Sequence, residues 1–302
     1  MTVSNKPPLT PSYLNKVVSF HLQGVGFLYG AKRRELDAQT PNQNSNSDLG
    51  SKQLSHQNSD LPLTLTNITL EAHQGEIVAI IGPSGAGKSS LLSLLATQSK
   101  PTIGRLAVLN QNPEQLSHRA LKTLRSRIGF IHQSPPIPPK QRVVTAVLAG
   151  KLGQWSLLRS LVSLVYPLDI EGAFQALDKV QMSQFLFERC DQISGGQLQR
   201  VGIARTMYQK PELILADEPV SSLDPELSAL TIRALLDQAK LSNATFLASL
   251  HSVDIALKYF PRVVGLRGGE ILFDLPTQEV TENLLTELYA TEQGRIPSQL
   301  KV

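Results

Sequence analysis

The segment Gly82–Ser89, GPSGAGKS, constrains this chain more than any other, because it matches the pattern G-x-x-x-x-G-K-[ST] in full. It follows a continuous apolar run at Glu76–Gly82 and opens a stretch of helical character at Lys88–Thr97. A buried strand, a glycine-rich loop and a helix N-terminus together bind phosphate through backbone N–H groups. A glycine-rich turn without a ligand is the alternative, and the flanking elements disfavour it. The predicted phosphate-binding residues are Gly82, Pro83, Ser84, Gly85, Ala86, Gly87, Lys88, Ser89 and Ser90.

Two carboxylates complete the chemistry that such a loop needs. An apolar strand at Leu213–Ala216 ends in Asp217 and Glu218. Lys88 would neutralise the β- and γ-phosphates, and Ser89 and Asp217 would hold Mg²⁺. Glu218 would orient or deprotonate an attacking water molecule. Without the phosphate loop upstream, the two acids would be interpreted as solvated residues at the end of a strand.

Strands alternate with helices along most of the chain, which predicts an α/β domain with a mainly parallel sheet. The expected strands are Val17–Tyr29, Leu63–Ala72, Glu76–Gly82, Ile128–His132, Leu213–Ala216, Thr245–Leu250 and Arg262–Leu266. The expected helices are Lys88–Thr97, Arg119–Ser126, Val143–Val165, Ile170–Val180, Gln197–Tyr208 and Pro225–Ala239. The all-helical stretch at about 141–207 interrupts the alternation and predicts an inserted helical subdomain.

Composition suggests how the chain is divided. Residues 1–16 read as an N-terminal tail without a signal peptide, 17–275 as the nucleotide-binding domain, and 276–302 as a helical tail. Within the domain, 31–62 is a polar insertion rich in Asn, Gln and Ser, expected to be disordered, and 134–210 is the helical subdomain. The single cysteine, Cys190, excludes an internal disulfide and fits a reducing cytosol.

The stretch Val147–Pro167 is rich in Leu and Val and holds the only tryptophan, Trp155. Lys151 and Arg159 interrupt it, so it is too short to span a bilayer. Most of its apolar residues are expected in the core of the helical subdomain, and some of the Gly150–Arg159 segment is expected on a docking surface. The chain carries a formal net charge of +4, with a basic cluster at Arg119–Arg127. A solvated helix face is the favoured interpretation of that cluster, and an anionic membrane surface or nucleic acid is the alternative.

A second glycine motif narrows the class of protein. The segment Ile193–Gln197, ISGGQ, resembles the signature of ABC-type ATPases, and the other family motifs occur in the same order. Gln133 matches the Q-loop glutamine, Ser222–Asp224 the D-loop, and His251 the switch histidine. Tyr29 lies where the family places an aromatic residue on adenine, although core packing is an alternative there.

The resemblance implies a P-loop NTPase core of the ABC type, with an antiparallel β subdomain and an inserted α-helical subdomain. It implies ATP and Mg²⁺ as cofactors, and Gln133 as a further contact to the metal. It also implies a head-to-tail dimer, in which the phosphate loop of one copy faces the signature of the other. The residues expected on that second half-site are Ser194, Gly195, Gly196, Gln197 and Asp224. Solvated or structural roles remain open for Gln133 and His251.

One branch of the family is similar in further segments. The segment AVLAGKLG, followed by WSLLRSL, and the later SLHSVDIALKYF look like the ATP-binding subunit of phosphonate importers. That similarity implies an ATPase at the cytoplasmic face of the inner membrane, docked on permease subunits that receive substrate from a periplasmic or extracellular binding protein. No nucleic-acid partner is expected. The rival interpretations are the ATPase of another ABC importer or of a lipid exporter, and a soluble ABC ATPase acting on nucleic acid.

Overall fold

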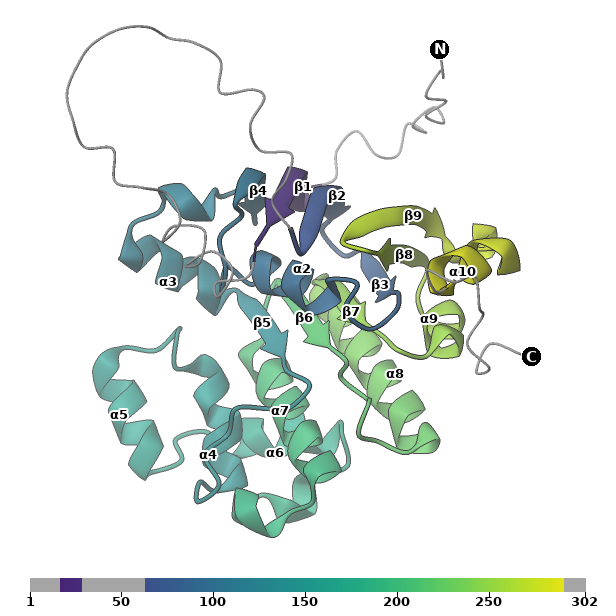
Figure 1. Ribbon diagram of the computed structural model, residues 1–302. Coiled ribbons are helices and arrows are strands. Elements are labelled where there is room, and N and C mark those ends of the chain that lie inside the picture. Colours follow the sequence, from purple (N-terminus) through teal and green to yellow (C-terminus); the bar gives the residue numbers. More distant parts are fainter. Residues whose placement is uncertain (1–16, 29–62, 291–302) are drawn as a thin grey trace, which may run out of the picture.

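The computed structural model describes residues 17–28 and 63–290, whose strands form two sheets (Figure 1). The smaller sheet is antiparallel, in the order β2-β1-β4. Its strands are β1 (Val18–Phe27), β2 (Leu65–His73) and β4 (Ile103–Val108). Buried and more exposed residues alternate along most of β2, as expected where one face of an antiparallel sheet covers a core.

The larger sheet positions the predicted site. It has six strands in the order β5-β6-β7-β3-β8-β9, all parallel except β9, which pairs antiparallel with β8. The strands are β3 (Ile77–Ile81), β5 (Ile128–Ile131), β6 (Leu213–Asp217), β7 (Thr245–Ser249), β8 (Arg262–Arg267) and β9 (Glu270–Pro276). Because neighbouring strands are parallel, the loops after β3, β5, β6 and β7 all leave the same edge of the sheet.

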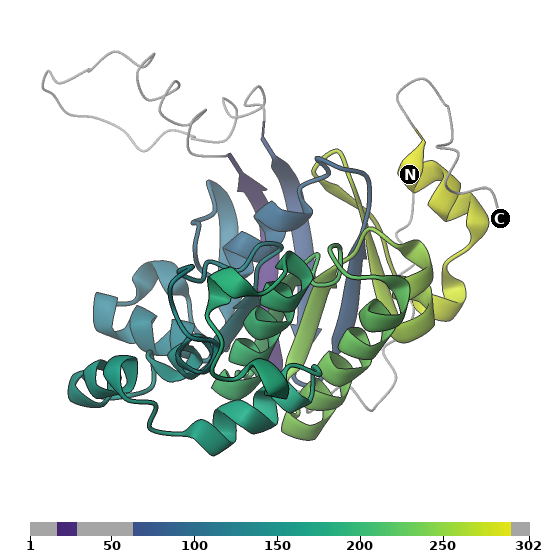
Figure 2. The same cartoon turned by 90° about the horizontal axis from the view of Figure 1, so that it is seen from below.

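Two hydrophobic cores flank this sheet. Alternate residues of β3 enter opposite cores, with Ala79 and Ile81 on one side and Val78 and Ile80 on the other. The first core is shared with α4, α7 and α8, and the second with α2 and the antiparallel sheet. The helices named here are α2 (Lys88–Leu95), α4 (Val143–Leu148), α7 (Gly195–Gln209) and α8 (Pro225–Ser242). Figure 2 shows α7 and α8 on one side of the sheet.

A group of helices lies beside the sheets, in the lower part of Figure 1. Within it, α7 packs against α4 and α6 (Ile170–Asp178). Helix α5 (Leu157–Val165) lies at the outer margin, on the same side of the molecule as α3 (His118–Ser126) in both views. Among the described residues, no helix is both long enough and apolar enough to cross a membrane.

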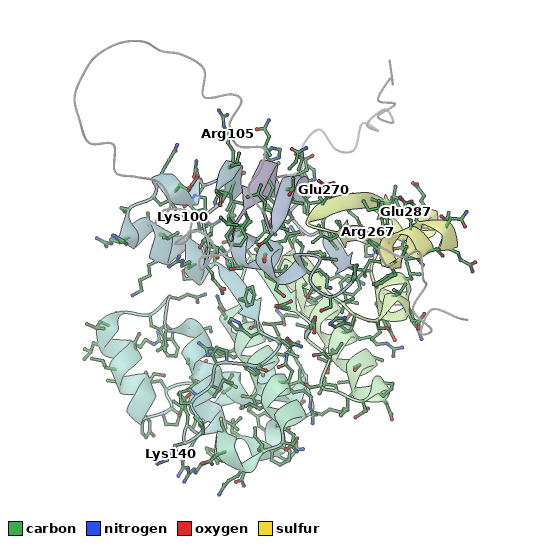
Figure 3. The ribbon with its side chains drawn as sticks, in the orientation of Figure 1. Lys100, Arg105, Lys140, Arg267, Glu270 and Glu287 are labelled. Carbon is green, nitrogen blue, oxygen red and sulfur yellow. The ribbon has the colours of Figure 1, made fainter. Side chains whose placement is uncertain are left out.

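The last described helix is tied to the edge of the large sheet. The Arg267 guanidinium, at the end of β8, donates hydrogen bonds to the carbonyl oxygens of Glu287 and Ala290. These carbonyls lie at the C-terminus of α10 (Glu282–Tyr289), and Figure 3 labels Arg267 and Glu287 side by side. The bonds satisfy carbonyl groups that a helix end leaves without an internal partner.

The fold class expected from the sequence is confirmed, and three elements were missed. Strands β4 and β9 and helix α9 (Val253–Tyr259) were not predicted. The two strands are short and expose polar residues such as Arg105 and Glu270, so their partners rather than their own pattern define them.

The stretch Val143–Val165 is mainly helical, as expected, but it is divided into two helices. Helix α4 ends at Leu148, a 3₁₀ turn follows at Ala149–Lys151, and α5 begins only after the N-cap Ser156. A Cβ at Gly150 would lie 2.4 Å from the Arg205 carbonyl oxygen, so this turn packs directly onto α7. The expected burial of most Leu and Val residues is wrong for Leu161 and Val162 of α5, which are exposed, as are Leu157 and Leu158.

Several expectations fall on residues that the structure does not describe. They are the tail at 1–16, Tyr29, the polar insertion at 31–62, and residues 291–302 of the C-terminal tail.

Candidate active site

The glycine-rich loop between β3 and α2 rests on the end of β8. Gly82 has φ +149°, and a Cβ there would lie 2.0 Å from the Leu266 carbonyl oxygen. The Gly269 N–H also donates to the Ala86 carbonyl oxygen at 3.2 Å. The close approach of two backbones explains why glycine occupies the first position of the motif.

The Lys88 side chain folds back along the loop. Its ammonium donates to the carbonyl oxygens of Gly82 at 2.8 Å and Pro83 at 3.0 Å, and the residue is only 5% exposed. Burial lowers the pKa of Lys88, and the charges of Glu218 and Asp217 counteract that shift. A buried cation that contacts only neutral carbonyl groups is well suited to neutralise the negative charge of a phosphate.

An oxygen cluster lies where the loop meets β6. The Ser89 hydroxyl donates to Asp217 Oδ1 at 3.0 Å, and the Ser249 hydroxyl donates to the same oxygen at 2.7 Å. Asp217 and Ser249 are register partners at the ends of β6 and β7. Within the described residues, no group of three or more His, Cys, Asp or Glu gathers around a possible metal position. Hydroxyl and carboxylate oxygens with few protein ligands fit Mg²⁺, which retains water and substrate oxygens in its coordination shell.

Glu218 is held by two polar side chains from neighbouring strand ends. Gln133 Nε2 donates to Glu218 Oε2 at 2.8 Å, and His251 Nε2 lies 2.5 Å from Oε1. The carboxylate is 12% exposed, while the imidazole of His251 is 53% exposed. Glu218 has φ +49°, a conformation that few non-glycine residues adopt and that marks functional sites. The turn places the carboxylate beside the phosphate loop rather than in the sheet.

Two site residues were not identified from the sequence. Ser249 is fully buried, and besides bonding Asp217 it accepts a hydrogen bond from the Glu218 N–H at 3.0 Å. Gln199, on α7, donates to the carbonyl oxygens of His132 at 2.9 Å and Pro219 at 3.2 Å. The only sequence signal for Ser249 is a polar residue in an otherwise apolar stretch, and Gln199 lies among other polar residues and has no such signal.

The signature segment forms the N-terminus of α7. The Ser194 hydroxyl accepts from the Gln197 N–H at 3.3 Å, and the Gln197 side chain accepts from the Ser194 N–H at 2.7 Å. This reciprocal cap holds the helix start rigid. A Cβ at Gly195 would meet nothing within 4 Å, whereas one at Gly196 would lie 3.2 Å from the Ser222 carbonyl oxygen. The signature therefore packs against the D-loop of its own chain and leaves an open face at Gly195.

Asp224 has a local role in this chain. Its carboxylate caps α8 by accepting a hydrogen bond from the Leu227 N–H at 2.9 Å, with Pro225 as the first helical residue. Hydrogen bonds connect Lys88 to its loop, Ser89 to Asp217, and Gln133 to Glu218. Within the described residues, no hydrogen bond joins Ser194–Gln197 or Asp224 to that group.

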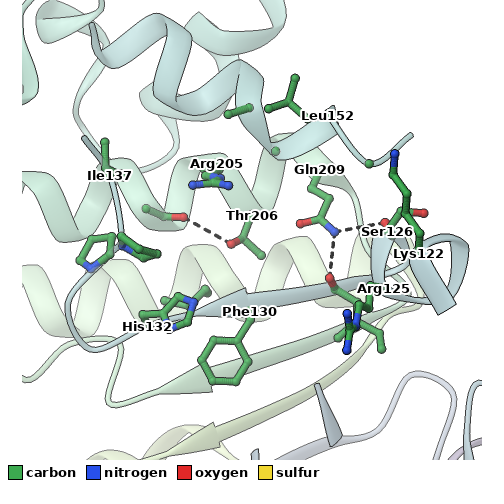
Figure 4. Close-up of a pocket in the computed structure, with 18 of the residues that line it drawn as sticks. Lys122, Arg125, Ser126, Phe130, His132, Ile137, Leu152, Arg205, Thr206 and Gln209 are labelled. Atoms are coloured by element: carbon green, nitrogen blue, oxygen red, sulfur yellow. Dashed lines mark hydrogen bonds between the residues drawn. The ribbon is translucent and has the colours of Figure 1, made fainter. Parts of the chain in front are cut away.

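A groove of about 440 Å³ separates α3 and β5 from the turn after α4 (Figure 4). Gln209 bridges its floor by donating to the carbonyl oxygens of Ser126 and Ile128. The cations lining it are Lys122, Arg125 and Arg205, and no lining residue is acidic. Burial lowers the pKa of His132 on its wall, and the charge of Arg205 lowers it further, while Asp217 raises it.

A second cavity, of about 470 Å³, lies beside Glu218 and His251. Residues of the D-loop, the start of α8 and α9 complete its walls.

A phosphate loop opening onto a carboxylate pair at one edge of a parallel sheet defines a P-loop nucleotide-binding ATPase. The family model for the ABC transporter matches residues 65–221. The chain belongs to the ABC transporter family, as an ATP-binding cassette.

The named relatives cover most of the chain. It is 58% identical to phosphonates import ATP-binding protein PhnC 1 of Cupriavidus necator, over 78% of this chain and 84% of the relative. It is 59% identical to phosphonates import ATP-binding protein PhnC 1 of Pseudomonas aeruginosa, over 76% of this chain and 86% of the relative.

Solved structures share the fold. A dimeric ATP-binding cassette bound to ADP and phosphate superimposes with a TM-score of 0.66 at 24% identity, covering 86% of this chain and all of its own length. A cassette in its ADP conformation gives a TM-score of 0.67 at 22% identity, over 91% of this chain and all of its own length.

Proposed function

We propose that this chain is the ATP-hydrolysing subunit of an ABC importer for phosphonates or related phosphorus oxyanions. The observation that carries the proposal is the 58% identity, over 235 residues, to a protein named for phosphonate import. The site residues of ATP hydrolysis are all present, which distinguishes the chain from a subunit that only binds nucleotide.

The phosphate loop and Lys88 bind the triphosphate. In this proposal the Lys88 ammonium exchanges its bonds to loop carbonyls for bonds to the β- and γ-phosphates, which compensates for its burial. Ser89, Asp217 and Gln133 would hold Mg²⁺, and the Ser249 hydroxyl fixes the Asp217 carboxylate. The metal supplies neutralisation of charge on the transferring phosphoryl group.

Glu218 accepts the proton of the attacking water. Its two oxygens are fixed by Gln133 and His251, so the carboxylate has a defined direction before ATP binds. With ATP bound, the second ring nitrogen of His251 would be available to the γ-phosphate and the Gln133 amide oxygen to Mg²⁺, while both side chains keep their contacts to Glu218. Fixing the base in advance lowers the reorganisation required in the transition state.

Two copies assemble head to tail around ATP. The open face at Gly195 and the rigid start of α7 suit a second phosphate contact, which would come from the nucleotide of the partner subunit. Asp224 contributes by holding the D-loop at the start of α8. Hydrolysis removes the shared ligand and releases the pair.

The groove between α3 and the turn after α4 receives the permease. His132 lines this groove, and Gln133 is the next residue in the chain. Movement of a docked segment is therefore transmitted directly to the catalytic glutamine. The lining cations Lys122, Arg125 and Arg205 favour an acidic segment. The chain then lies at the cytoplasmic membrane face, and its complex receives substrate from a binding protein on the other side.

Uptake of a labelled alkylphosphonate tests this function. Cells with Glu218→Gln in place of the wild-type subunit should lose uptake, while purified Glu218→Gln protein should retain ATP binding and dimerise more persistently. Phosphite, phosphate and an unrelated solute serve as competitors. Uptake that is indifferent to the substitution would contradict the phosphonate assignment, and hydrolysis at the wild-type rate would contradict the role of Glu218.

A further inference from the structure

Helix α5 (Leu157–Val165) presents aliphatic side chains to solvent and a serine to the protein. Leu157 is 77% exposed and Leu158 74%, whereas Ser163 is 2% exposed. Leu161 and Val162 are also exposed and share the face of the first two, because residues three and four apart lie together on a helix. A surface helix normally turns its apolar stripe toward the core. This arrangement indicates that an apolar partner covers the exposed face of the helix.

The chain segment that carries this face is rich in basic residues. Between residues 115 and 168 the chain has eight Lys and Arg residues and no Asp or Glu. They are Arg119, Lys122, Arg125, Arg127, Lys140, Arg142, Lys151 and Arg159. Within the described part of the chain, only Arg127 of this set forms a salt bridge. Figure 3 shows Lys140 at the outer end of the helical group, and α3 and α5 lie on one side of the molecule.

Aromatic residues stand at both ends of α5. Tyr166 is exposed at the C-terminal end. Trp155 precedes the helix, and the Arg159 guanidinium carbon lies 4.7 Å from the centroid of its ring. Tyr and Trp beside Arg and Lys, next to a leucine face, are the residue types of helices that lie in the membrane interface.

We propose that α5 inserts its aliphatic face, Leu157, Leu158, Leu161 and Val162, into the headgroup region of an anionic bilayer. Basic residues of 115–168 that do not line the groove, such as Lys140, Arg142 and Arg159, contact lipid phosphates around it. These four side chains line neither of the cavities described above and form an exposed helix face. Such a face suits a fluid lipid surface, whereas a permease segment docks in a groove. This contact is additional to the permease contact and does not depend on which solute is carried.

Trp155, the only tryptophan, provides a built-in reporter beside α5. The purified full-length chain is mixed with vesicles of phosphatidylglycerol and phosphatidylethanolamine with brominated acyl chains, and tryptophan quenching and vesicle flotation are measured. We expect quenching and flotation that weaken with added salt and are much weaker on phosphatidylcholine alone. The double variant Leu157→Ser/Leu158→Ser should bind roughly tenfold more weakly or worse, because it removes several buried carbon groups.

Leu241→Ser is the matched control, since Leu241 is an 82% exposed leucine on α8, away from α5. It should bind vesicles like the wild type, and both variants should keep the basal ATPase rate. Failure of the wild type to bind anionic vesicles would overturn the proposal, as would equal binding of the double variant. Loss of recovery with the purified permease in detergent, without any effect on vesicle binding, would assign the face to the permease and overturn the lipid contact.

Discussion

Substitution of Ser249 by alanine should slow ATP hydrolysis although Ser249 does not contact the nucleotide in the proposed mechanism. Its hydroxyl donates to Asp217 Oδ1 at 2.7 Å and accepts from the Glu218 N–H at 3.0 Å. It therefore fixes both the proposed metal ligand and the backbone that carries the proposed base. Alanine leaves the strand backbone unchanged, because only one oxygen atom is removed.

The magnitude follows from the hydrogen bond that is lost. A bond to a charged carboxylate contributes about 1.5–3 kcal/mol. If that amount is lost only in the transition state, the rate falls by roughly 10- to 150-fold, since about 1.4 kcal/mol corresponds to a factor of ten. The Glu218 N–H keeps a longer backbone bond to the Ser249 carbonyl oxygen at 3.2 Å, so the turn itself should persist.

The assay is steady-state release of phosphate by the purified chain with saturating MgATP, alongside thermal unfolding. Thr245→Val is the matched control, because Thr245 is also fully buried on β7 and its hydroxyl donates to the His73 carbonyl oxygen, away from the site. Both variants should lose stability, but only Ser249→Ala should lose kcat. Equal rates in the two variants would refute a positioning role for Ser249.

The remaining predictions concern the loop, the buried thiol and α7. Gly82→Ala should abolish folding or nucleotide binding, because the added Cβ would lie 2.0 Å from the Leu266 carbonyl oxygen. Gly85→Ala should lower the unfolding free energy by only about 1–2 kcal/mol, because its φ of +81° is strained for alanine but its Cβ meets no other atom. Burial raises the pKa of Cys190 to about 11 from 9.0. Alkylation of this thiol should therefore be about a hundredfold slower in the native protein than in the unfolded chain. The stability that the buried neutral thiol contributes should be full below pH 9 and lost as pH rises toward 11. Gln199→Leu should lower kcat more than ATP affinity, measured by turnover and nucleotide titration, because it frees the carbonyl groups of His132 and Pro219.

The phosphate loop could be predicted from the sequence because its residues are contiguous in the chain. The strand, the glycines and the helix start of Gly82–Ser89 are neighbours in the chain, so their geometry depends on local backbone preferences. The same is true of the signature, whose Ser194 and Gln197 form a cap within one turn. The α/β class followed from the alternation of apolar strands and helices for the same reason.

Positions that depend on strand order could not be predicted from the residues alone. Gln133, Glu218 and His251 meet because β5, β6 and β7 are adjacent and parallel, which no local pattern specifies. The role of Glu218 followed from the acidic end of its strand, whereas only family resemblance suggested the roles of Gln133 and His251. Ser249 had no such resemblance and was missed, although the register of β6 and β7 places it opposite Asp217.

The apolar stretch after α4 shows the same division most clearly. Its sequence determined that it holds helices, that it is too short to span a bilayer, and that it carries basic residues without acids. Hydrophobicity predicted burial for most of its leucines. In the tertiary structure the turn at Gly150 packs on α7, and the helix that follows has Ser163 inward and Leu157 and Leu158 outward. Which face of a helix is buried depends on the neighbour it packs against, and that neighbour comes from distant sequence.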